Sequence, residues 1–218
     1  MDPDALLRVV LTVVTMLLSV AVHEYAHALA AFKLGDDFAA RQGRLTLNPF
    51  AHADPLGTLL IPAVFAFIGG GGFGWGKPVP YIPTSLTRKY SMRAGEAIIA
   101  FAGPLANLIL GVLSAGLLVG LSSLGVIRWE SPFTTLLFTL MNLNFVLFFF
   151  NLLPVPPLDG SKVASWLLGS RADRALDAIQ GAGMMGLIIA MMLGGRVISP
   201  LVRVLSRWVT EGFGAIFT

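Results

Sequence analysis

The chain has 218 residues, of which 56% are hydrophobic and only 12% are charged, with a net charge of +3. A soluble domain is about one quarter charged, so this composition excludes an ordinary water-soluble protein and indicates a membrane protein. The basic excess does not indicate a nucleic-acid partner, because cytoplasmic loops of membrane proteins carry extra Lys and Arg. The chain contains no cysteine, so a bound metal must be held by His, Asp or Glu.

Several apolar stretches have the length of about 20 residues that a helix needs to cross a bilayer. The first is preceded by Asp2 and Asp4 rather than by basic residues, which argues against a signal peptide and for a retained span with its N-terminus outside. The stretches of spanning length are 5–33, 95–121, 132–153 and 181–201.

A shorter apolar stretch, 56–73, contains Pro62 and a run of four glycines near its end. The segments on either side, 33–54 and 74–94, both carry Lys and Arg and are therefore predicted to be cytoplasmic. The stretch would then enter and leave the membrane on one face as a re-entrant hairpin, which is tolerated where protein or a wet cavity satisfies the backbone. A short true span is the alternative.

The stretches 95–121, 132–153 and 181–201 are predicted to cross the membrane outward, inward and outward in turn. The segment 161–180, which carries several charges, is predicted to be a helix on the cytoplasmic surface. We therefore predict an all-α polytopic membrane protein with about four full transmembrane helices and a re-entrant or short fifth element. The chain forms a single domain over 1–218, with a core at about 6–168 and a C-terminal span and interfacial tail at 181–218.

The first stretch contains the HExxH sequence His23-Glu24-Tyr25-Ala26-His27. Residues four apart lie on one helix face, so His23 and His27 can bind one zinc ion. Glu24 lies beside them and can act as general base on water. His and Glu are costly inside a membrane helix and are rarely retained there without a role. The alternative is a polar cluster that only bonds neighbouring helices.

Two histidines leave a zinc site short of a protein ligand, and the candidates are His52 and Asp159. His23 begins about 18 residues into the first span, about 27 Å along the helix, and so lies near its cytoplasmic end. Asp159 follows a span that runs inward and therefore lies at the same end. We predict that Asp159 is the third ligand of one Zn²⁺ per chain, with the fourth position open as in catalytic zinc sites.

In these residues the chain resembles the site-2 protease family of intramembrane zinc metalloproteases. The family pattern pairs HExxH in one transmembrane helix with an N-x-x-P-x-x-x-x-D-G stretch in another, which stands here at 151–160. A third family-like element is found at 102–107. The chain has no room for an inserted PDZ or CBS domain, so it resembles a minimal member of the family.

The resemblance implies cleavage of a peptide bond in or near the transmembrane segment of a membrane protein, at an active site that faces the cytoplasm. It also implies that Asn151 positions the substrate or the developing oxyanion. The alternative for Asn151 is bonding to backbone groups that the following prolines leave without partners.

Two further regions near the motif each allow two interpretations. His52 and Asp54, in a polar loop, could enter the site as an additional ligand or a proton carrier, although turn formation is the alternative. Residues 38–47 and 73–82 could form a small β-hairpin whose edge captures an extended substrate by backbone pairing. Trp75 in that hairpin could instead be an interfacial anchor.

The sequence as a whole predicts a zinc-dependent endopeptidase in a prokaryotic plasma membrane. Its partners would be the lipid bilayer, a transmembrane protein substrate and a regulatory membrane protein, without nucleic acid. An inactive homologue that serves as a membrane scaffold is the alternative, and intact Glu24 argues against it. An ion transporter would need further charged residues along the other spans, where they are nearly absent.

Overall fold

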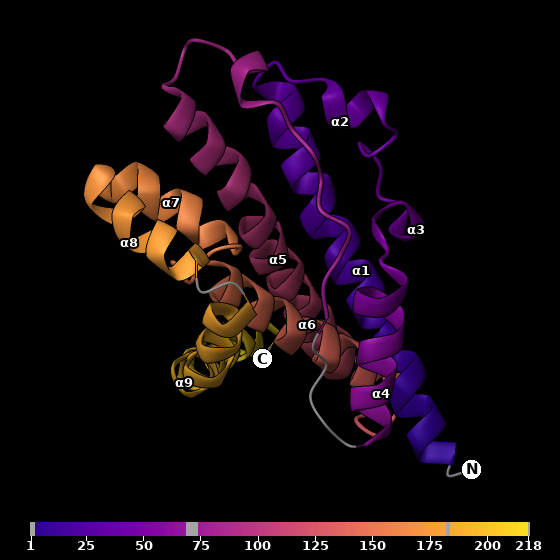
Figure 1. The fold of residues 1–218 in the computed structure, drawn as a ribbon. Helices are drawn as coiled ribbons and strands as arrows, with labels where there is room; N and C mark the ends of the chain where they lie inside the picture. The colour runs from indigo at the N-terminus through magenta and orange to yellow at the C-terminus, as the bar shows by residue number, and fades with distance from the viewer. Residues whose placement is uncertain (1–2, 69–73, 182–183, 218) are drawn as a thin grey trace.

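The computed structural model describes residues 3–68, 74–181 and 184–217, and it contains no β-strand among them. The prediction of an all-helical protein is therefore confirmed for the described residues (Figure 1). In chain order the elements are α1 (Pro3–Lys33), α2 (Phe38–Arg41), α3 (Pro49–His52), η1 (Pro55–Leu60, a π-helical turn), α4 (Ile61–Phe67), η2 (Pro83–Ser85, a 3₁₀ turn), α5 (Met92–Ser123), α6 (Pro132–Asn151), α7 (Asp159–Leu168), α8 (Ser170–Gly181) and α9 (Met184–Phe217).

Three of the described helices are long and apolar enough to cross a membrane, with spans at Ala5–Lys33, Met92–Ser123 and Pro132–Asn151. These agree with the first three predicted stretches. The predicted fourth span, 181–201, includes residues 182–183, which lie outside the described residues. Four full spans are therefore not confirmed, although the chain from 184 onward is helical.

The long helix α5 lies at the centre of the molecule, packed against α1, α6, α7 and α9 (Figure 1). Ser91 starts it by accepting the N–H of Ala94 at 3.2 Å, which satisfies one of the unpaired donors of the first turn. Between α5, α6 and α9, Ala115, Met141 and Phe145 are almost completely buried. This core fixes α6, and with it the following helix α7, relative to α5, which in turn packs against α1.

The segment between α1 and α5 leaves the C-terminal end of α1 and comes back to it. α4 packs against α1, and Pro55–Phe67 is apolar but shorter than a span. Residues 74–82 then return alongside in extended form, until the N–H of Thr87 donates to the carbonyl oxygen of Leu34 at 2.6 Å. The course of the chain agrees with a re-entrant excursion, while residues 69–73 lie outside the described residues.

The predicted β-hairpin is wrong for the residues that the structure describes. Asp36, which is buried, accepts the N–H of Phe38 at 3.1 Å, and the chain then turns into α2 instead of a strand. The other carboxylate oxygen of Asp36 accepts the N–H of Ile82 at 2.6 Å. A side chain therefore provides the partner that the predicted strand would have supplied.

The predicted surface helix at 161–180 is divided in two. Gly169, at φ +64°, separates α7 from α8. Asp173 of α8 accepts from Ser165 of α7 at 2.6 Å and pairs with Arg93 of α5 at 2.7 Å. These contacts hold α7, whose first residue is Asp159, against the start of α5.

Candidate metal centre and active site

The two histidines of the HExxH sequence lie on one face of α1, as their spacing requires. Their Nε2 atoms are 2.9 Å apart, and the two rings meet edge to face with centroids at 4.5 Å. His27 is buried and His23 partly so. A single ion could therefore contact both imidazoles without movement of the backbone.

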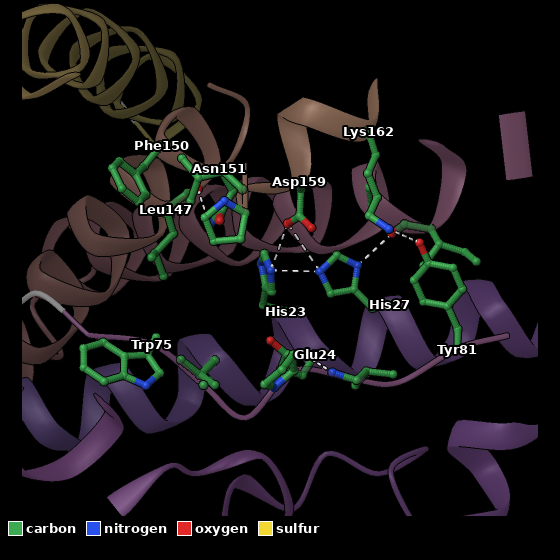
Figure 2. Close-up of a pocket in the computed structure, with 18 of the residues that line it drawn as sticks. His23, Glu24, His27, Trp75, Tyr81, Leu147, Phe150, Asn151, Asp159 and Lys162 are labelled. Atoms are coloured by element: carbon green, nitrogen blue, oxygen red, sulfur yellow. Dashed lines mark hydrogen bonds and ion pairs between the residues drawn. The ribbon is translucent and has the colours of Figure 1, made fainter. Parts of the chain in front are cut away.

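Asp159 reaches this pair from the first turn of α7 (Figure 2). Its Oδ2 atom lies 3.2 Å from Nε2 of His23 and 3.4 Å from Nε2 of His27. The next residue, Gly160, allows the approach, because a Cβ there would stand 2.3 Å from the carbonyl oxygen of Leu152. His23, His27 and Asp159 thus form a group whose ligand atoms all lie within 4.8 Å of one another.

The donor chemistry of this group fits a zinc ion. Nδ1 of His27 lies 2.7 Å from the carbonyl oxygen of Ile99, which can only accept, so Nδ1 carries the proton. Nε2 of a neutral His27 is then a lone-pair donor to a metal, and it faces the Asp159 carboxylate. These lone pairs converge on one point where a cation could be bound, and two imidazoles with one carboxylate are a known catalytic zinc set.

Helix α5 leaves room for the metal ligands at Gly103. A Cβ on Gly103 would stand 2.4 Å from Nε2 of His27 and 2.7 Å from Cε1 of His23, both far inside van der Waals contact. The family-like element at 102–107 therefore lies directly against the two rings. Its glycine is required by the packing of the site.

Asp159 is suited to remain ionised as a ligand. Burial alone would raise the pKa of its carboxyl, but when the imidazoles of His23 and His27 carry a second proton, their hydrogen bonds and positive charge hold that pKa below its ordinary value. A carboxylate must be deprotonated to bind a metal. Asp159 meets this condition at neutral pH.

Glu24 lies on the other side of the two histidines from Asp159, below them in Figure 2. Its side chain is largely buried, and its Oε2 accepts the backbone N–H of Val79 at 2.9 Å. A Cβ on Gly76 would meet Cγ1 of Val20 at 2.4 Å, so the glycine lets the extended segment lie this close to α1. The segment 74–82 therefore holds the carboxylate of the expected general base.

A cavity of about 540 Å³ joins these groups. Asn151, at the end of α6, lines it, while its Nδ2 donates to the carbonyl oxygen of Leu147 at 3.0 Å. That bond lies within the helix of Asn151, so both roles expected for this residue stay open. The other lining residues include Val20, His23, Glu24, His27, Trp75, Gly76, Pro78, Val79, Tyr81, Phe150, Pro157, Asp159 and Lys162.

His52 and Asp54 are not brought into this cluster. His52 is fully buried, and its Nε2 lies 2.8 Å from the carbonyl oxygen of Thr46. Asp54 accepts the N–H groups of Leu56 at 3.0 Å and Gly57 at 2.7 Å, which starts η1. Both side chains shape the loop before η1 and α4, in agreement with the turn alternative.

One cluster at the rim of the cavity was not predicted from the sequence. Lys162 hydrogen-bonds the hydroxyl of Tyr81 and pairs with Glu96 at 3.6 Å, and that hydroxyl lies 3.1 Å from Oε1 of Glu96. Burial would lower the pKa of Lys162, but Tyr81 and Glu96 raise it above the ordinary value. The sequence spacing could have predicted that Lys162 lies near the site, because Lys162 follows Asp159 by one helical turn and shares its face.

The comparisons with known proteins agree with this site. The model described as peptidase family M50 matches residues 123–194, which include Asn151 and Asp159. A Bacillus subtilis protein named "Putative zinc metalloprotease YwhC" is 38% identical over 94% of this chain and 91% of its own length. "Putative zinc metalloprotease Rip2" of Mycolicibacterium smegmatis is 31% identical over 93% of this chain and 71% of its own length. No solved structure matches the chain.

Proposed function

The chain belongs to peptidase family M50, the site-2 protease family, and on that premise we propose that it is a zinc-dependent intramembrane endopeptidase. The family and the names of the relatives indicate a zinc metalloprotease. Our proposal adds that the scissile peptide bond lies in or near the transmembrane segment of a membrane protein. The supporting observation is that His23, Glu24 and His27 belong to a helix of spanning length and meet Asp159 in one cavity.

His23, His27 and Asp159 would hold the zinc ion, which supplies a Lewis acid that polarises the scissile carbonyl and makes water more acidic. Glu24 takes a proton from the attacking water and passes it to the nitrogen of the departing amine. The N–H of Val79 keeps the Glu24 carboxylate in one orientation for both transfers. Asn151 is positioned along the cavity to contact the substrate backbone.

The extended segment 74–82 is suited to hold the substrate. Its residues Trp75, Lys77 and Val79 direct their N–H groups toward the protein, to Gly57, His52 and Glu24. Because successive residues of an extended chain face opposite ways, Gly76 directs its N–H and carbonyl toward the other side, and Pro78, which has no N–H, directs its carbonyl there. Both residues line the cavity. A substrate unwound beside this edge could pair with it, which exposes the peptide bond that a helix would conceal.

We place the protein in a prokaryotic plasma membrane, oriented so that the cavity opens to the cytoplasm. The segments next to the metal ligands, 33–54, 74–94 and 161–180, carry most of the chain's Lys and Arg. Such residues are enriched in cytoplasmic loops. Water would then reach Glu24 from the cytoplasmic side.

Metal removal in reconstituted vesicles tests the proposal. The purified protein would be co-reconstituted with a panel of tagged single-span membrane proteins, and the cut sites would be mapped by mass spectrometry. We expect cleavage within or next to the spans, loss of cleavage after chelation, and recovery with added zinc. Cleavage that survives complete metal removal, or that falls only in distant soluble loops, would contradict the proposal.

A further inference from the structure

A closed network of buried amide groups lies behind the zinc ligand His23 and connects three helices. Asn107 of α5, Asn144 of α6 and Ser19 of α1 are each completely buried. Unpaired amides are costly in an apolar interior, so side chains of this kind require partners. From these contacts we infer that Asn107 is a positioning residue, which holds His23 in the one tautomer and ring orientation that can bind the metal.

The orientation of the outer amide, Asn144, is fixed by a backbone carbonyl. Its Nδ2 lies 2.8 Å from the carbonyl oxygen of Leu140, which can only accept. The same Nδ2 donates to the hydroxyl of Ser19 at 2.9 Å, and that hydroxyl donates to the carbonyl oxygen of Thr15 at 2.8 Å. Oδ1 of Asn144 must therefore point at Asn107.

The orientation of Asn107 follows from two acceptors. Its Nδ2 lies 2.7 Å from Oδ1 of Asn144 and 3.2 Å from the carbonyl oxygen of Ser19. Both N–H groups of the amide are therefore used, one on each acceptor. Oδ1 of Asn107 is left to face His23, and it can only accept a hydrogen bond.

His23 completes the chain of donors. Its Nδ1 lies 2.6 Å from Oδ1 of Asn107, so the proton of the neutral ring is on Nδ1 and the lone pair is on Nε2. Nε2 is the atom that lies 3.2 Å from Asp159. The backbone carbonyls on α1 and α6 thus fix the orientation of the two amides. The amide of Asn107 in turn places the proton of His23 on Nδ1 and leaves Nε2 free to bind the metal.

His23 and His27 reach the same tautomer by different means. Nδ1 of His27 bonds a main-chain carbonyl, that of Ile99, which no substitution of the Ile99 side chain removes. Nδ1 of His23 depends on one side chain, and that side chain comes from another helix. Partners of this type commonly change metal affinity by about 10–100-fold when they are removed.

A matched pair of substitutions separates positioning from general support of the fold. Asn107→Ala and Asn144→Ala each remove one fully buried amide from the same network. We expect Asn107→Ala to raise the zinc dissociation constant by about 10–100-fold in chelator competition, since it removes the partner of a ligand. We expect Asn144→Ala to raise this constant clearly less than Asn107→Ala does, because Asn107 then keeps both its bond to His23 and the bond from its Nδ2 to the carbonyl oxygen of Ser19.

Asn107→Asp provides the conservative rescue. It keeps an oxygen that can accept from Nδ1 of His23 but loses the N–H groups that bond Asn144 and Ser19, so its zinc affinity should lie between those of the wild type and Asn107→Ala. Equal losses in Asn107→Ala and Asn144→Ala would show a structural role only and would overturn the inference.

A measurement on the unaltered protein does not depend on how the variants fold. The chain has only three histidines, so ¹⁵N-histidine NMR of the zinc-loaded protein can be assigned with His52→Gln. We expect a proton on Nδ1 and the metal shift on Nε2 for both His23 and His27. A proton on Nε2 of His23 would overturn the inference. Absence of zinc binding in the wild type would instead contradict the proposed function, on which this inference rests.

Discussion

At the scale of single residues, the proposed metal centre depends on three side chains from two distant segments. His23→Ala and Asp159→Ala each remove one ligand, and we expect each to weaken zinc binding by at least about 100-fold, more than the loss of a hydrogen-bonding partner. The measurement is metal content after dialysis against a zinc buffer. His52→Ala is the control, since His52 is not part of the cluster. Undiminished zinc in either ligand variant would contradict the assignment.

The sequence was sufficient to predict that His23, His27 and Asp159 lie together, because the signals could be read directly from motif spacing and loop charge. HExxH spacing predicted that His23 and His27 share a helix face, and loop charges predicted that Asp159 lies at the same depth. The hydrogen bond that His23 donates to Asn107 could not be predicted. It depends on the rotation of α5 relative to α1, which is determined by packing contacts such as Gly103 against the two rings.

At the scale of elements, the close packing of α5 against α1 provides a prediction with an internal control. Gly103→Ala would place a Cβ 2.4 Å from Nε2 of His27, whereas Gly111→Ala would place one 2.5 Å from the ring of Phe145. Overpacking of this kind commonly costs about 1–3 kcal/mol of stability. We expect both variants to be less stable in thermal unfolding, but only Gly103→Ala to lose zinc affinity. Equal zinc affinity in the two would contradict the packing described for the metal site.

The extended segment gives a prediction about the general base. Val79→Pro removes the N–H that donates to Glu24, while Val79→Ala keeps it. We expect Val79→Pro to reduce kcat about tenfold or more through misplacement of the carboxylate, with zinc content unchanged. Val79→Ala should retain most of the wild-type kcat. If the two variants cleave at the same rate, the backbone donor does not orient Glu24.

The segment 74–82 also shows what a sequence pattern cannot predict about a secondary-structure element. Residues 74–82 are extended as a strand would be, yet they have no strand partner among the described residues. Their backbone groups bond to Glu24, Asp36, His52 and Gly57, which belong to or follow helices. A local pattern predicts extension, but the partner of an extended segment is a long-range property.

At the scale of the whole molecule, the membrane orientation can be tested without background labelling, because the chain has no cysteine. Arg88→Cys lies in the exposed loop before α5, and Glu130→Cys lies in the loop between α5 and α6. We expect a membrane-impermeant maleimide to label Glu130→Cys in intact cells, and Arg88→Cys only after permeabilisation. The reverse pattern would place the cavity on the outer face of the membrane.

The central claim is that Glu24 is the general base of a zinc-dependent intramembrane endopeptidase. The most direct test compares cleavage of one co-reconstituted transmembrane substrate by the wild type and by Glu24→Gln, with bound zinc measured in both preparations. The account predicts equal zinc content and a loss of cleavage of at least about 100-fold, as expected when a general base is removed. Equal cleavage rates at equal zinc content would contradict it.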